Sequence, residues 1–255
     1  MSWLWGVGLA GCVAAVAYRM RLLTLGGALS ATLVGASVFG VGGVVASAPM
    51  IAFFFSSSLL PRLLGRPHKT ERRIALQVLA NGLAPALCCW GVWLSASHAS
   101  PFWLGYAASL AVAAADTWAT EFGVRFGKDA RLITTGKPVP KGESGGVSLA
   151  GTLGGCGGAM AIALLGAPLL SGAGAIAVAV GVGVWGMLLD SWLGATLQAR
   201  YRCPLCQAIG EQRRCCNAPA IPQRGVAWMD NNAVNLISTL AGAILGIGAA
   251  WLLHL

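Results

Sequence analysis

The chain has 255 residues, of which 56% are hydrophobic and only 10% are charged, and its mean hydropathy is +0.72. Because a soluble domain carries about 25% charged residues, this composition excludes an ordinary soluble protein and predicts a membrane protein with several spans. The net charge of +9 does not indicate a nucleic-acid partner, because the cations lie in short segments between apolar runs, where membrane orientation explains them.

A helix needs about 20 apolar residues to cross a bilayer. We therefore predict an all-α, polytopic membrane helix bundle with about eight transmembrane helices, forming a single integral membrane domain over residues 1–255. In chain order, the predicted spans are 2–18, 22–41, 43–61, 74–97, 101–122, 145–165, 171–197 and 229–253.

The basic residues support this arrangement of spans. All 17 Lys and Arg follow odd-numbered spans, so one orientation places every cation on the same side. The positive-inside rule makes that side cytoplasmic and puts both termini outside. We expect an integral protein of a bacterial inner (plasma) membrane, with its active face on the cytoplasmic side.

Acidic residues interrupt two of the spans near their cytoplasmic ends. Asp116 and Glu121 end the span 101–122, and Asp190 lies near the end of 171–197. A carboxylate at this depth is costly unless it is paired, hydrated or bound to a cation. Each could pair with a loop Arg or Lys. Alternatively, the carboxylate oxygens converge at one depth in the membrane and bind Mg²⁺, which completes its shell with water and substrate phosphates. This alternative predicts a metal–phosphate site.

The loop between the fifth and sixth spans, which we place at 123–144, has the composition of a phosphate-binding loop. It and the residues directly after it supply Lys137, Lys141, Ser144, Gly145 and Gly146. Glycine lets backbone amides turn toward a ligand, and lysine adds a mobile positive charge. We expect "ESGG" (143–146) to begin a helix whose free amides face a phosphate. The alternative is an ordinary basic loop with a serine cap on the next helix.

Polar residues also mark the last two spans. In "LLDSWLGATLQ" (188–198), Asp190, Ser191, Gly194 and Gln198 share roughly one helical face. In "WMDNNAVNLIS" (228–238), Asp230 could simply cap the helix. A cap does not need Asn231 and Asn235 one turn apart, and these amides are suited to a nucleotide, a phosphate or a second metal.

Four motifs in this order, "AADTWATEFG", "GGVSLAGTLGG", "LLDSWLGATLQ" and "DNNAVNLIS", carry a family resemblance. From about residue 22 to the C-terminus, the chain resembles the domain-of-unknown-function 92 family, which includes transmembrane protein 19 and a plant phytyl-phosphate kinase. Glu143 departs from the small or polar residue of the family pattern. The motif positions that match are Asp116, Glu121, Ser144, Gly145, Gly146, Asp190, Asp230, Asn231 and Asn235.

The resemblance implies a membrane kinase that transfers a phosphoryl group from a nucleoside triphosphate, CTP in the first instance, to an isoprenoid (phytyl or prenyl) monophosphate at the cytoplasmic interface. Such a reaction needs metal, cationic clamps and positioning more than covalent catalysis. We expect Asp116, Glu121 and Asp190 to hold Mg²⁺, directly or through water. Either Asp116 or Asp190 would orient the attacking oxygen. Lys137, Lys141 and the amides of 144–146 would hold phosphates. Asp230, Asn231 and Asn235 would hold the nucleotide or a second metal.

Two other functions share these features. A lipid-phosphate cytidylyltransferase would use nearly the same residues. A transporter or flippase of a phosphorylated lipid would also need acids in its spans, but its polar site would lie near the midplane rather than at one edge. All three would contact membrane lipids.

The last cytoplasmic loop, 198–228, contains "CPLCQAIGEQRRCC" with Cys203, Cys206, Cys215 and Cys216. A C-x2-C pair followed by two further cysteines is typical of a structural zinc site, although the adjacent second pair departs from the usual spacing. The alternative is four inert, reduced thiols.

Overall fold

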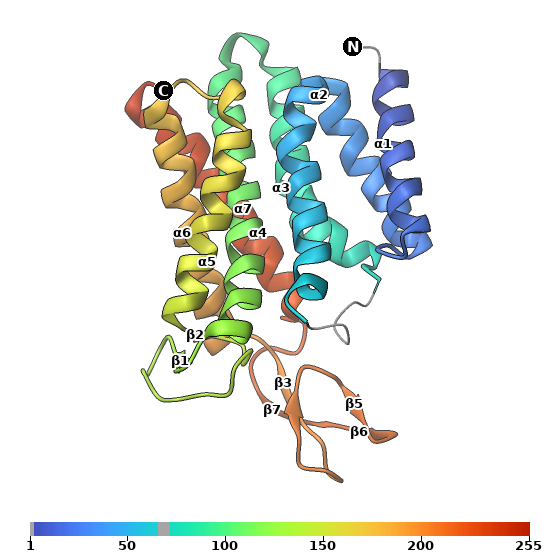
Figure 1. Cartoon of the computed structure of the whole chain (residues 1–255), viewed down its shortest axis with the longest axis vertical. Helices are drawn as coiled ribbons and strands as arrows, with labels where there is room; N and C mark the ends of the chain where they lie inside the picture. The colour runs from blue at the N-terminus through green and yellow to red at the C-terminus, as the bar shows by residue number, and fades with distance from the viewer. Residues whose placement is uncertain (1–2, 66–71) are drawn as a thin grey trace.

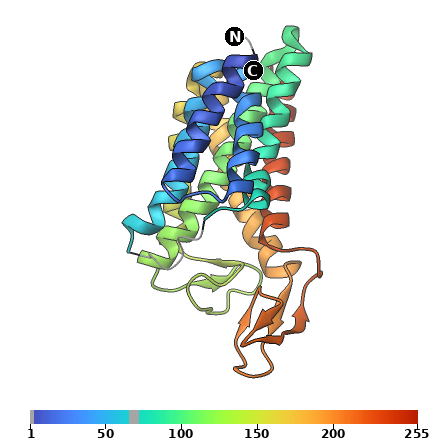
Figure 2. The same ribbon diagram turned by 90° about the vertical axis from the view of Figure 1, so that its right-hand side faces the viewer.

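The computed structural model describes residues 3–65 and 72–255, and these residues are mostly helical. Seven α-helices form a bundle (Figure 1), with short 3₁₀ turns at Ala96–His98 and Ala167–Leu169. The two termini lie at one end of the bundle, and all the β-strands lie at the other (Figure 2). The helices are α1 (Trp3–Arg19), α2 (Leu25–Leu63), α3 (Ala75–Leu94), α4 (Ala99–Phe126), α5 (Leu149–Leu165), α6 (Ala173–Thr196) and α7 (Asn231–Leu253).

Four helices, α2, α3, α6 and α7, are long and apolar enough to cross a membrane by length and composition. The helical membrane architecture predicted from the sequence is therefore confirmed. The number of eight spans stays a prediction, because α1 and α5 have only 17 residues each and α4 is not among the four helices that qualify. The outside location of the termini also stays a prediction. Of the charged residues counted in the prediction, Arg66, Lys69 and Glu71 lie outside the described residues.

Helix α2 is two helical segments that meet at Gly43. A straight helix of its 39 residues would extend about 58 Å at 1.5 Å per residue. However, Phe54 and Leu59 near its end pack in one cluster with Leu22 and Leu23, which precede its start. The chain therefore reverses direction within α2, and Gly43, with φ 61° and ψ −152°, is the non-helical residue inside it. The two segments correspond to the second and third predicted spans.

We expect the substitution Gly43→Ala to destabilise the protein by about 1–3 kcal/mol, because this backbone region is essentially restricted to glycine. Thermal unfolding of the purified protein in detergent measures the effect. Gly8→Ala, at a position where an added Cβ meets nothing within 4 Å, is the matched control and should leave the melting temperature unchanged. An equal shift in both variants would contradict the assignment of the reversal to Gly43.

Helix α4 is central to the bundle. It packs against α2, α3, α5, α6 and α7. Its middle section is fully buried and consists largely of alanines, with Tyr106 and Leu110 as the large side chains. Small residues let helix backbones approach closely where no hydrophobic effect drives association in lipid. This packing holds the C-terminal part of α4, with Asp116 and Glu121, among the ends of the surrounding helices.

The loops at the lower end contain short strands that the all-α prediction did not include. In the α4–α5 loop, β1 (Arg131–Leu132) pairs antiparallel with β2 (Gly146–Val147). In the α6–α7 loop, β3 (Arg200–Arg202) lies between β4 (Ile209–Gly210) and β7 (Ile221–Arg224), and β5 (Arg214–Cys215) pairs with β6 (Ala218–Pro219). In register, Tyr201 is opposite Gly210 on one side and Pro222 on the other.

Candidate functional site

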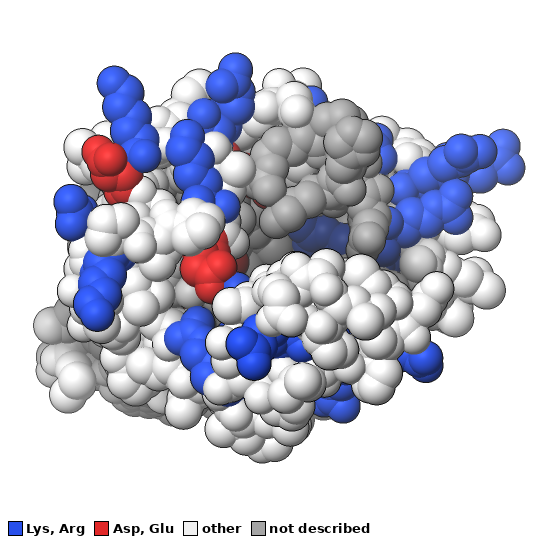
Figure 3. Space-filling model, turned by 90° about the horizontal axis from the view of Figure 1, so that it is seen from below, with Lys and Arg blue, Asp and Glu red and all other residues white. Residues whose placement is uncertain are grey.

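A polar cavity of about 960 Å³ lies at the strand-bearing end of the bundle. The ends of α2, α4 and α6, the starts of α3, α5 and α7, and both long loops contribute to its lining. Figure 3, which views this end, shows Lys and Arg side chains around a hollow in the surface. The predicted site residues that line the cavity are Asp116, Glu121, Lys141, Ser144, Gly145, Gly146, Asp190, Asp230, Asn231 and Asn235.

The carboxyl groups of Asp116 and Asp190 lie within hydrogen-bonding reach of each other, although 74 residues separate them in sequence. The Asp190 side chain is buried, and the Asn235 amide nitrogen, in the orientation that satisfies its neighbours, donates to Asp190 Oδ2 at 3.1 Å. Neither aspartate forms an ion pair with a cation in the described part of the chain. Two carboxylates this close repel one another unless a proton or a cation lies between them.

Glu121 does not join this pair. Across the described ranges, the ligand oxygens of Asp116, Glu121 and Asp190 do not all gather around one point, and the assignment of all three to Mg²⁺ stays a prediction. Five residues advance a helix by about 500°, which places Glu121 well away from Asp116 around the axis. Helix α4 also continues to Phe126 rather than ending near 122, so Asp116 lies about 15 Å from its C-terminus.

The expected helix start at "ESGG" is wrong. Gly146 belongs to strand β2, and α5 begins at Leu149 with Ser148 as its cap, whose Oγ accepts from Gly151 N at 3.2 Å. The reason is Gly145, whose φ of 81° no helix accommodates. A Cβ at Gly145 would also lie 2.5 Å from Ala195 Cβ, so this turn packs directly on the end of α6. The serine cap on the next helix is confirmed, at Ser148, and phosphate binding by the loop stays a prediction.

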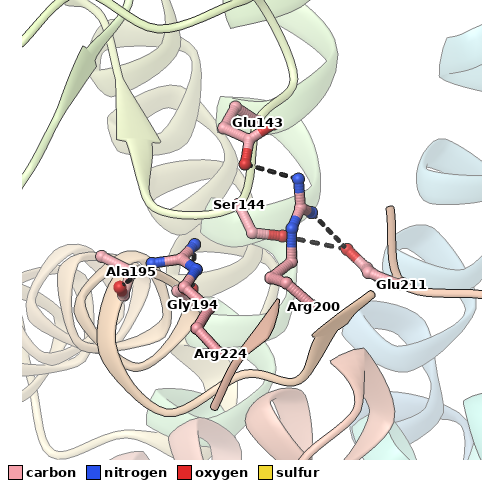
Figure 4. A network of polar contacts seen from close by, with 7 residues as sticks. All are labelled: Glu143, Ser144, Gly194, Ala195, Arg200, Glu211 and Arg224. Atoms are coloured by element: carbon pink, nitrogen blue, oxygen red, sulfur yellow. Dashed lines mark hydrogen bonds and ion pairs between the residues drawn. The ribbon is translucent and has the colours of Figure 1, made fainter. Parts of the chain in front are cut away.

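Arg200 organises the wall of the cavity that the two loops form (Figure 4). Its buried guanidinium pairs with Glu143 and lies 3.6 Å from Glu211, which also accepts a 2.9 Å hydrogen bond from Ser144 Oγ. The charge of Glu143, the residue that departs from the family pattern, is therefore neutralised within the protein. Arg224 donates to the carbonyls of Ala195 and Gly194 at the end of α6.

Lys137 is not at the cavity. It is exposed, and its backbone closes the tip of the α4–α5 loop through a hydrogen bond from Leu132 N to its carbonyl. The arginines that do line the cavity were not predicted from the sequence; they are Arg21, Arg62, Arg73 and Arg200. Burial lowers the pKa of Arg73 to about 10, so this guanidinium remains charged at neutral pH. The sequence offered little indication of their role, because the positive-inside rule already accounts for arginines in short loops between membrane spans.

At the start of α7, Asp230 is the N-cap, and its Oδ1 accepts from Ala233 N at 2.9 Å. The capping interpretation of Asp230 is therefore confirmed, and the residue also lines the cavity. Gln77 and Asn81, at the start of α3, line it as well. They were missed because no acidic residue marked that span.

The comparison with known proteins agrees with the motifs. The model of the integral membrane protein DUF92 family matches residues 8–243. The chain belongs to this family. The resemblance seen in the sequence is thus confirmed, and with it the assignment as an integral membrane protein.

Relatives occur in Synechocystis, Methanocaldococcus jannaschii and Arabidopsis thaliana. An uncharacterized membrane protein of Synechocystis, sll0875, is 31% identical, with 92% of this chain and 85% of that protein covered. Protein PGR of Arabidopsis thaliana is 29% identical, covering 89% of each chain. Protein VTE6, chloroplastic, of the same plant is 28% identical over 69% of this chain and 47% of its own length. No solved structure matches the chain.

Proposed function

We propose that this protein is a membrane-embedded prenyl-phosphate kinase. The four sequence motifs resemble a family that includes a plant phytyl-phosphate kinase, and the family match and the distant relative VTE6 agree with that resemblance. The substrate, an isoprenoid monophosphate, would receive a second phosphoryl group from a nucleoside triphosphate, with CTP as the donor that the family resemblance favours. The following features of the cavity support this proposal.

The main observation is that the polar cavity adjoins an apolar one. A second, much smaller cavity of about 80 Å³ lies between α1, α2 and α3, and residues such as Ala14, Val38 and Phe53 line it. Arg73, Gln77 and Asn81 line both cavities. A ligand with a phosphate head and a hydrocarbon tail needs this combination, because the tail must leave water while the charged head keeps polar partners.

The polar cavity is also large enough for two phosphorylated ligands. Its volume of about 960 Å³ is at the upper end of the roughly 300–1,000 Å³ that small-molecule sites span. Cations line it from α2, from the segment before α3 and from the α4–α5 loop, through Arg62, Arg73 and Lys141. These positive charges suit phosphate oxygens. We assign the nucleotide to the side formed by Asp230, Asn231 and Asn235.

The paired carboxyls of Asp116 and Asp190 fit a divalent cation, because they are close together and lack a cationic partner in the described residues. Mg²⁺ typically takes one or two carboxylates and completes its shell with water and phosphates. It would supply charge neutralisation for the transferring phosphoryl group. Glu121 would then line the wall of the cavity or bind the ion through a water molecule. Lys137 has no part in this site, because it does not line the cavity.

The reaction itself moves one phosphoryl group. The terminal oxygen of the prenyl monophosphate attacks the γ-phosphorus of the nucleotide, and the bond from that phosphorus to the β–γ bridging oxygen breaks. The products are prenyl diphosphate and a nucleoside diphosphate. The attacking phosphate is already ionised, so positioning by the protein matters more than a strong base. By the positive-inside rule we place the site at the cytoplasmic face of a bacterial plasma membrane.

The decisive assay uses purified protein with Mg²⁺, labelled CTP and a panel of prenyl monophosphates of different chain lengths. Formation of prenyl diphosphate and CDP is the expected result. A CDP-linked lipid with release of pyrophosphate would show a cytidylyltransferase instead. No turnover of CTP, ATP or GTP, together with movement of prenyl phosphate across a reconstituted bilayer, would overturn the kinase and indicate a transporter.

Substitution of Arg73 tests the link between the two cavities. We expect Arg73→Gln to raise the KM for the prenyl monophosphate by about 10-fold or more, because a charge-assisted hydrogen bond of about 1.5–3 kcal/mol to the lipid phosphate is lost. The KM for the nucleotide should change much less. Steady-state kinetics with each substrate varied separately measure this, with Arg72→Gln, outside both cavities, as the control. Equal effects on the KM values of both substrates would contradict the assignment of Arg73 to the phosphate of the prenyl substrate.

A further inference from the structure

The four cysteines of the α6–α7 loop form one cluster. Cys203 directly follows β3 and Cys206 lies in the turn that leads to β4, whereas Cys215 is in β5 and Cys216 is next to it. Their four Sγ atoms all lie within 4.8 Å of one another. The distances are 3.7 Å between Cys206 and Cys215 and 3.8 Å between Cys215 and Cys216, and all four thiols are free.

These distances are those of a tetrahedral thiolate site. Zinc–sulfur bonds of about 2.3 Å at tetrahedral angles place sulfur atoms about 3.8 Å apart. Sulfur atoms that only pack against one another have no reason to gather around a common point. A four-thiolate, tetrahedral set is the donor set that zinc favours, with iron as its main competitor.

The backbone explains how two adjacent cysteines face the same point, which the sequence spacing did not predict. Cys216 and Asn217 have φ of 51° and 59° and form a two-residue turn between β5 and β6. Left-handed residues of this kind reverse the chain sharply, so Cys216 turns back toward Cys215. On the other side, Gln207, with φ of 60°, donates its N–H to the Cys203 carbonyl and closes the turn after Cys206.

Apolar packing contributes little to the part of the loop that carries the cysteines. Its strands have two to four residues each, and Leu205, Ile209 and Ile221 are exposed. Small units that cannot build an apolar core commonly depend on a metal or on disulfides. Metal binding is then coupled to folding, because the ligands come together only in the folded loop.

We propose that Cys203, Cys206, Cys215 and Cys216 bind one Zn²⁺ and that this ion fixes the β3–β4 hairpin at the mouth of the polar cavity. The first ligand pair forms the turn of that hairpin. Its two strands lead directly to Arg200 and Glu211, which line the cavity and pair with each other at 3.6 Å. The ion thus positions the wall of the cavity without contacting the ligand within it.

The test measures metal bound to the purified full-length protein, independently of any enzymatic activity. We expect about one zinc per chain by elemental analysis, and loss of most of it in Cys206→Ser and in Cys216→Ser, because each removes one of four thiolates. Cys12→Ser, an exposed cysteine of α1, is the matched control and should keep the zinc. Replacement by Co²⁺ should give thiolate-to-cobalt absorption bands in the wild type and in the control alone.

A second measurement covers the case in which a variant folds poorly. In the wild-type protein, thiol alkylation followed by mass spectrometry should show these four cysteines protected, and removal of the metal by a chelator should expose them while the bundle stays intact by circular dichroism. Protein that is folded but metal-free, with all four thiols reactive, would overturn the proposal. Iron in place of zinc, or zinc retained in the double variant Cys206→Ser/Cys216→Ser, would overturn it as well.

Discussion

Replacing Asp190 with asparagine is expected to lower phosphoryl transfer at least about 100-fold, because one of the two carboxylates proposed to hold the Mg²⁺ that neutralises charge in the transition state is lost. The substitution keeps the size of the side chain. It also removes the repulsion between Asp190 and Asp116, whose carboxyls are in contact, so the melting temperature should stay the same or rise. Loss of activity without loss of stability is typical of a residue retained for function.

The experiment compares initial rates and thermal unfolding in the same detergent preparation. Asp116→Asn should behave like Asp190→Asn, since the two act as a pair. Asp129→Asn, an exposed acid of the α4–α5 loop outside the cavity, is the matched control and should leave both quantities unchanged. Full activity in Asp190→Asn, or a loss that merely follows a lower melting temperature, would remove this pair from the reaction.

Replacing Arg200 with leucine is expected to have the largest effect on stability. Its side chain is only 7% exposed, and it compensates Glu143 and Glu211 together. Removing one partner of a buried ion pair costs about 3–5 kcal/mol, and we expect a value at the lower end because both glutamates keep some contact with water. The cavity wall should loosen, so activity should fall together with the melting temperature.

A second substitution distinguishes the ion pair from simple packing. In Arg200→Leu/Glu143→Gln the uncompensated charge of Glu143 is absent, so part of the lost stability should return. Arg202→Leu, exposed on the same strand and outside the cavity, is the control and should change the free energy of unfolding by less than about 0.5 kcal/mol. If the double variant is no more stable than Arg200→Leu, the interaction between Arg200 and Glu143 does not carry the effect.

Most residues of the candidate site were accessible from the sequence for one physical reason. A polar group in an apolar helix must find its partners inside the protein, so acids and amides in the spans mark the positions where the helices surround something polar. Asp116, Asp190 and Asn235 came from three separate motifs, and the structure brings them to one cavity. The lysines of the α4–α5 loop can instead be solvated by water, so their sequence positions did not predict which of them reaches the cavity. Lys141 lines it and Lys137 does not.

The sequence by itself determined the class of protein, the helical segments, the family and the level at which the polar residues gather, because these follow from hydrophobicity and local spacing. Only the tertiary structure decided which side chains meet. The contact of Asp116 with Asp190, the pairing of Arg200 with Glu143 and the convergence of the four cysteines join residues that are distant in sequence or depend on left-handed backbone at single positions. Such contacts arise from the packing of whole helices and the path of the loops, which local sequence patterns do not encode.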